Sequence, residues 1–192
     1  MYTICPLPAE IRMILTAGCF VFLLFSMPQR TQAASSAPPL PTVSSVDLAR
    51  YMGTWYEIAR FEQFFQEGCV GSTATYSMRS DGDVKVVNSC TNEADGKKRE
   101  AVGRAWVVDA STNAKLKVSF FWPFRGDYWI IDLGREYEYV AIGSPNRKYL
   151  WILARQRVLD EAVYAGVRER VARMGFAVEN LIQRPYSAKG EK

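Results

Sequence analysis

The residue types that most often carry out catalysis are scarce in this sequence. It has no histidine and four cysteines among 192 residues. The absence of histidine excludes Ser-His and Cys-His catalysis and most zinc sites, because histidine is the commonest general base and metal ligand. Among the acids, Asp132 alone has a strand position that would allow it to face an enclosed interior. We therefore expect no catalytic residue, no metal ligand and no cofactor.

Two of the cysteines, Cys69 and Cys90, lie on either side of a predicted hairpin turn. The turn is Ser80-Asp81-Gly82-Asp83, in which Gly82 can adopt the positive φ that tight turns require. A hairpin about this turn brings both thiols to its open end. A bridge there would close a loop of about twenty residues and stabilise the fold by roughly 3 kcal/mol. A disulfide is expected, and two unpaired buried thiols are the alternative.

The N-terminal segment has the layout of a secretory signal peptide. Residues 13–27 are uncharged and mostly apolar, Arg12 precedes them, and small residues around Ala33 offer a cleavage site. This stretch is shorter than the roughly 20 residues of a membrane-spanning helix, although a retained anchor stays an alternative. The run ending in Cys19 also resembles the lipidation site of bacterial lipoproteins. We expect an exported protein of the periplasm or outer membrane, with a lipid anchor on Cys19 as the alternative.

Composition divides the chain into four parts. We predict a signal peptide over 1–33, a flexible linker over 34–45, one folded domain over 46–186 and a short tail over 187–192; the linker is rich in Ser, Ala and Pro and carries no charge. The formal net charge is only +4. This small excess, without a long basic run, argues against a nucleic-acid partner.

The folded domain reads as all-β followed by one helix. Short segments rich in β-branched and aromatic residues recur at the spacing of about 8 to 12 residues that is typical of a sandwich or barrel. Strands are predicted at 55–61, 71–78, 83–90, 99–108, 115–121, 127–133, 138–142 and 149–155. Residues 160–174 carry apolar side chains at helical spacing and predict a helix packed on the outside of the sheet. A helix lying on a membrane surface is the alternative, but its polar face mixes charges of both signs. Residues 181–186 could return as a short final strand.

The first strand resembles the opening of the bacterial lipocalins, a group that is also similar to apolipoprotein D and the plant temperature-induced lipocalins. The matching blocks, in the order of that group, are Gly53–Phe61, Ala74–Ser77, Lys117–Phe121, Gly126–Tyr128 and Tyr149–Arg155. The resemblance spans 46–186 and implies an eight-stranded antiparallel up-and-down β-barrel with one C-terminal helix packed outside. In the family an arginine packs on the first-strand tryptophan at the closed end, which implies that structural role for Arg155 and Trp55.

A barrel of eight strands encloses either side chains or one small ligand. Strand alternation, together with the resemblance, predicts that the inward-facing residues are Tyr76, Val84, Val86, Asn88, Trp106, Leu116, Val118, Phe120, Tyr128, Ile130, Tyr139 and Trp151. Aromatic and aliphatic walls with a few polar groups suit an elongated apolar molecule, so the expected partner is a fatty acid or a lysophospholipid. In the alternative interpretation these side chains fill the barrel, and the protein works through its surface in the cell envelope.

Two aromatic segments are expected near the open end of the barrel. Phe64 and Phe65 follow the first strand, and residues 120–124 read Phe-Phe-Trp-Pro-Phe. Exposing so many apolar side chains would be costly without a purpose. We predict a lipid entrance or a surface that contacts a membrane or a protein partner, and a homodimer stays possible.

Overall fold

The computed structural model describes residues 38–183. Its strands are β1 (Gly53–Phe61), β2 (Cys69–Met78), β3 (Val84–Asn92), β4 (Lys98–Val107), β5 (Lys115–Phe121), β6 (Phe124–Leu133), β7 (Tyr139–Gly143), β8 (Leu150–Ala154) and β9 (Leu181–Ile182). The helices are α1 (Leu48–Tyr51) and α2 (Glu161–Arg173), with short 3-10 turns η1 (Phe64–Gln66) and η2 (Val178–Asn180).

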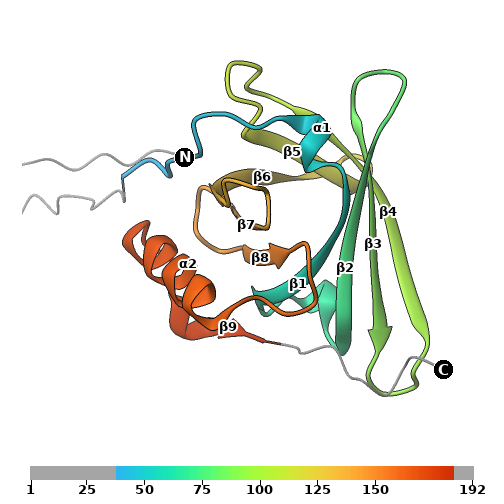
Figure 1. Ribbon diagram of the computed structural model, residues 1–192. Helices are drawn as coiled ribbons and strands as arrows, with labels where there is room; N and C mark the ends of the chain where they lie inside the picture. The colour runs from blue at the N-terminus through green and yellow to red at the C-terminus, as the bar shows by residue number, and fades with distance from the viewer. Residues whose placement is uncertain (1–37, 184–192) are drawn as a thin grey trace, which may run out of the picture. The chain divides into compact units, whose positions relative to one another are not determined.

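Strands β1 to β8 pair with their neighbours along the chain, and β1 pairs with both β2 and β8. Every pairing is antiparallel. Because β1 pairs on both of its sides, the sheet closes on itself as an up-and-down barrel, as Figure 1 shows. The two-residue strand β9 pairs with the C-terminal end of β1. The predicted fold class is therefore confirmed, with one short strand more than the eight that form the barrel.

The two ends of the barrel differ in their coverings. Helix α1 lies at the end of the barrel where β1 begins, which is also the end that carries the β2–β3 turn (Figure 1). We call this the closed end. The opposite, open end carries η1, the turn between β5 and β6 at residues 122–123, and the β3–β4 and β7–β8 connections.

The β2–β3 hairpin forms about the predicted turn. The main-chain nitrogen of Arg79 donates to the oxygen of Asp83 at 2.8 Å, and Gly82 has a φ of 86°. At the other end of the hairpin Cys69 and Cys90 form a disulfide, with their Cα atoms 5.5 Å apart. The disulfide expected from the hairpin is therefore present.

Helix α2 begins at the N-cap Asp160, whose side chain accepts hydrogen bonds from the main-chain nitrogens of Ala162 and Val163. Its Val167 and Val171 are fully buried in an apolar cluster between the helix and the outer face of the barrel. This placement agrees with the predicted helix outside the sheet.

The segment before β1 packs on the barrel. Leu40 is buried in the cluster beneath α2, and the main-chain nitrogen of Val43 donates to the oxygen of Ile130 at 3.1 Å. Leu40 and Val43, which fall in the segment expected to be a flexible linker, thus contact the barrel, because one apolar side chain is buried and the other partly buried. The predicted signal peptide, Cys19 and the tail lie outside the described residues. Within 38–183 no helix is long and apolar enough to cross a membrane.

Candidate functional site

The interior of the barrel is the candidate site, and its closed half is packed. The side chains of Tyr51, Tyr76 and Tyr128 meet there, with the Tyr128 hydroxyl 2.6 Å from that of Tyr51 and 2.9 Å from that of Tyr76. Burial raises the pKa of Tyr76 to about 12 and raises the pKa values of Tyr51 and Tyr128 as well. The three phenols therefore stay neutral at physiological pH and satisfy one another's hydrogen bonds.

Trp55 forms the base of this half. It is fully buried, and its Nε1 donates to the main-chain oxygen of Tyr51 at 2.9 Å. The Arg155 guanidinium carbon lies 3.9 Å from the centre of the Trp55 ring, an arrangement that matches the role implied by the family resemblance. Gly53 has a φ of 96°, and a Cβ there would lie 3.3 Å from Nη1 of Arg155. Glycine at this position therefore permits both the backbone conformation and the approach of the arginine.

The void left in the closed half is only about 10 Å³, which is the room that one water molecule needs. A pocket for a drug-sized ligand usually has roughly 300 Å³ or more. Five of the predicted ligand contacts line this void, namely Tyr76, Val84, Leu116, Tyr128 and Ile130. At these positions the structure shows packed core, and Val86 is buried beside them.

The open half differs because its inward-facing residues are only partly buried. Val118, Phe120 and Trp151 pack against the interior cluster and yet retain exposure to solvent. Asn88 pairs with the inward-facing Ala74 and is also partly exposed. Along β3 and β5 these residues lie further from the closed end than Val84 and Leu116, which line the void, and Trp151 lies near the start of β8 at the open end. A ligand that enters from the mouth would therefore meet these four residues first.

A buried polar cluster lies in the same half and was not predicted from the sequence. Glu57 and Arg60 are 6% and 0% exposed, and Nη1 of Arg60 donates to Oε1 of Glu57 at 2.5 Å. Strict alternation would put these two residues on opposite faces. A β-bulge between Glu57 and Ala59 shifts the alternation, so that Ala59 and Phe61 face α2 while Arg60 faces the interior.

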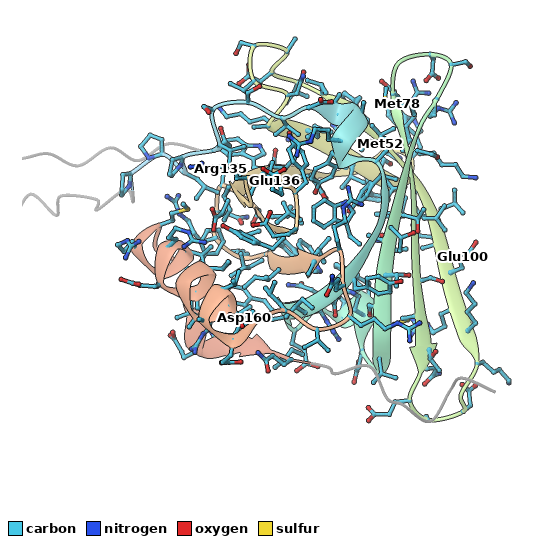
Figure 2. All side chains as sticks on the ribbon, viewed as in Figure 1. Met52, Met78, Glu100, Arg135, Glu136 and Asp160 are labelled. Carbon is cyan, nitrogen blue, oxygen red and sulfur yellow. A yellow bond between two sulfur atoms is a disulfide. The ribbon has the colours of Figure 1, made fainter. Side chains whose placement is uncertain are left out.

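Two predicted inward residues lie on the outer face. Trp106 sits between Ala105 and Val107, which pack inside, and it pairs with Lys117. Figure 2 shows Glu100 pointing away from the barrel, and Trp106 lies on the same face of β4 because it is an even number of residues further along the strand. The phenol of Tyr139 accepts a hydrogen bond from Nη2 of Arg170 on α2 at 2.9 Å.

The assignment of Trp106 and Tyr139 to the interior was therefore wrong. Both are aromatic residues that cover the outer surface. Aromatic character alone does not decide whether a strand residue faces the interior or the outside of the barrel. Asp132, the acid considered for an inward position, also faces α2, where it accepts a hydrogen bond from Nε of Arg170 at 2.9 Å.

The rim of the open end exposes large apolar side chains. Phe64 and Phe65 project from η1, and the β5–β6 turn carries Phe121, Trp122 and Phe124. Phe64 is 85% exposed and Trp122 is 79% exposed. The two aromatic segments expected near the mouth are both there. We call these five residues the aromatic rim.

Within residues 38–183 no group of three or more acidic or cysteine side chains is arranged to hold a metal ion. The chemistry on offer in the open half is apolar contact, with hydrogen bonds from one amide, one indole and the buried ion pair. Such a site can bind a molecule and orient it.

Comparison with known proteins places this barrel in a family. A model described as a lipocalin-like domain matches residues 46–186. The chain is 42% identical over 158 residues to the outer membrane lipoprotein Blc of Escherichia coli, covering 80% of this chain and 89% of that protein. It is 36% identical to temperature-induced lipocalin-1 of Arabidopsis thaliana over 157 residues, covering 77% of this chain and 83% of that protein.

Among solved structures, insecticyanin from the tobacco hornworm Manduca sexta is similar, with a TM-score of 0.64 and 20% identity. The likeness covers 79% of this chain and 87% of that one and supports the fold. With its closed eight-stranded barrel, its Trp55–Arg155 pair and a family match across the whole folded domain, the chain belongs to the lipocalin family.

Proposed function

We propose that this protein binds a hydrophobic ligand in the open half of its barrel and carries or stores it within the cell envelope. The observation that carries the proposal is the set of inward-facing but partly exposed side chains above a packed base, Asn88, Val118, Phe120 and Trp151. Apolar walls give binding energy by burial, at about 0.8 kcal/mol per methylene group. An acyl chain that enters from the mouth would contact these walls.

The ligand class that we favour is a fatty acid or a lysophospholipid. Either one joins an elongated apolar chain to a polar head, which matches apolar walls beside the buried Glu57–Arg60 pair. We infer a binding protein without catalytic activity, since Asp132 is held in an ion pair with Arg170 and Cys69 and Cys90 are held in a disulfide.

An envelope location is proposed on two grounds. The N-terminal 33 residues have the layout of an export signal. Relatives at about 40% identity bear the name outer membrane lipoprotein. Mass spectrometry of the mature N-terminus tests the location: a start at Ala34 supports free secretion, whereas a lipid-modified Cys19 supports an anchor.

A second candidate function is interaction through the surface, with a filled barrel. The small void of the closed half and the exposed aromatic rim favour it. The rim would then contact a membrane surface, a protein partner or a second copy of the chain. Size-exclusion chromatography with light scattering distinguishes the homodimer from the monomer.

Titration of the delipidated protein with an acyl-chain probe separates the two functions. We expect saturable binding of the probe, and native mass spectrometry of the untreated protein should find co-purifying lipid. If no probe binds and no lipid co-purifies, the carrier function is rejected and the surface function is favoured.

A further inference from the structure

The buried polar cluster of the open half includes a residue that reaches in from the rim. Gln66, at the end of η1, donates from Nε2 to Oε2 of Glu57 at 2.9 Å. Its Oε1 accepts from Nε1 of Trp151 at 2.9 Å, and its main-chain oxygen accepts from Nη2 of Arg60 at 3.1 Å. Two N–H donors from two strands of the barrel thus converge on the two oxygens of one residue.

One further donor in this cluster has no hydrogen-bond partner. Nε of Arg60 has no hydrogen-bond partner, and the whole side chain is only 1% exposed to solvent. A buried donor without a partner costs free energy and is rare in folded proteins. Nε and Nη2 form one planar edge of the guanidinium, whereas Glu57 binds Nη1. That edge is the one that can hold two oxygens of a carboxylate or a phosphate at once.

Gln66 is placed where an incoming head group would arrive. Gln66 and Trp151 are only partly buried, whereas Glu57 and Arg60 beneath them are buried. A head group that displaced Gln66 would therefore reach Trp151 and Arg60 while keeping some contact with water. That contact matters because Glu57 already neutralises Arg60, and an added negative charge would be costly to bury completely.

We propose that the Nε and Nη2 edge of Arg60 and Nε1 of Trp151 form the subsite for the anionic head of an amphiphilic ligand, and that Gln66 occupies this subsite in the empty barrel. The shared chemistry is a pair of anionic oxygens, from a carboxylate or from a phosphate. This inference rests on the proposed function, because it assumes that an acyl chain enters the open half. Gln66 would then be a specificity-determining residue that yields its hydrogen bonds to the ligand.

The test compares three probes with one acyl chain and different heads: palmitate, 1-palmitoyl lysophosphatidate and the neutral 1-palmitoylglycerol. We expect the delipidated protein to bind at least one anionic probe about tenfold more tightly than the neutral one, as expected for charge-assisted hydrogen bonds. The anionic probe that binds more tightly identifies the head as carboxylate or phosphate.

Trp151→Phe keeps an aromatic ring but removes the N–H donor together with part of the apolar surface of the indole. We expect it to weaken binding of the preferred anionic probe about fivefold more than binding of 1-palmitoylglycerol, because both probes lose the same apolar contact and only the anionic one loses a hydrogen bond. Trp106→Phe is the matched control on the outer face and should change neither affinity. Gln66→Ala removes the side chain that competes with the ligand and should tighten binding of the anionic probe.

The outcomes separate the subsite from the proposed function. If 1-palmitoylglycerol binds as tightly as both anionic probes, or if Trp151→Phe weakens all three probes equally, the subsite is rejected while the carrier function stands. If none of the three probes binds, the carrier function fails and the subsite fails with it.

Discussion

Arg155 makes three contacts that hold the closed end together. It lies over the ring of Trp55 and donates hydrogen bonds to the main-chain oxygens of Thr54 at 3.1 Å and Arg50 at 2.7 Å. Arg155→Leu removes all three and should lower the free energy of unfolding by about 2 kcal/mol. Urea denaturation measures this, with the exposed Arg135→Leu as a control expected to change it by less than about 0.5 kcal/mol. Equal effects of the two substitutions would contradict the structural role of Arg155.

The tyrosines of the closed half make a prediction about pH. Burial raises the pKa of Tyr76 from 10.0 to about 12. Between about pH 10 and pH 12 the folded protein therefore keeps a proton on Tyr76 that the unfolded chain has lost. The free energy of unfolding should therefore be unaffected by Tyr76 below pH 10 and fall above it, by about 1.4 kcal/mol per pH unit for this tyrosine.

Tyr76→Phe removes this contribution, whereas those of Tyr51 and Tyr128 remain. Urea denaturation at several alkaline pH values should therefore show a shallower fall of stability with pH in the variant than in the parent protein. An identical slope in both proteins would show that Tyr76 does not titrate in a buried environment.

Side-chain alternation predicted most of the interior from the sequence, and its failures have physical causes. Leu116, Val118 and Phe120 alternate along β5 and pack against the interior cluster as expected. Glu57 and Arg60 were missed because a bulge puts two residues of opposite parity on one face, and no residue in the run marks the bulge.

At the scale of elements, the disulfide joins the β2 and β3 strands across a sequence separation of 21 residues. Replacing both cysteines with alanine frees this loop in the unfolded chain and should lower the free energy of unfolding by about 3 kcal/mol. Chemical denaturation with and without a reductant measures it. The reductant should destabilise the parent protein and leave the double variant unchanged. A parent protein indifferent to the reductant would contradict the bridge.

The regular elements were predictable because each has a period or a terminating signal. The predicted helix over 160–174 matches α2, which has an Asp160 cap and a glycine after its last turn. Helix α1 was not predicted, because four residues are too few to show a period. Its Asp47 cap accepts hydrogen bonds from Ala49 and Arg50, but one capping residue without a periodic run is a weak signal.

At the scale of the whole molecule, the barrel could be predicted, but the division of its interior could not. The alternation of side chains along each strand predicts which residues face the barrel axis. Whether those residues fill the space depends on whether side chains from elements distant in the sequence meet, as Tyr51 of α1, Tyr76 of β2 and Tyr128 of β6 do. The sequence predicted that these residues line a ligand cavity, whereas in the structure those of the closed half pack together and those toward the mouth are only partly buried.

The central claim is that a hydrophobic ligand occupies the open half of the barrel. It is tested most directly by the affinity of the delipidated protein for a fluorescent fatty acid, measured before and after Asn88→Trp fills that half. We expect the substitution to raise Kd at least about tenfold by steric exclusion. Val84→Ala, in the packed closed half, should leave Kd within about twofold. Unchanged affinity in Asn88→Trp, or a large loss in Val84→Ala alone, would contradict the claim.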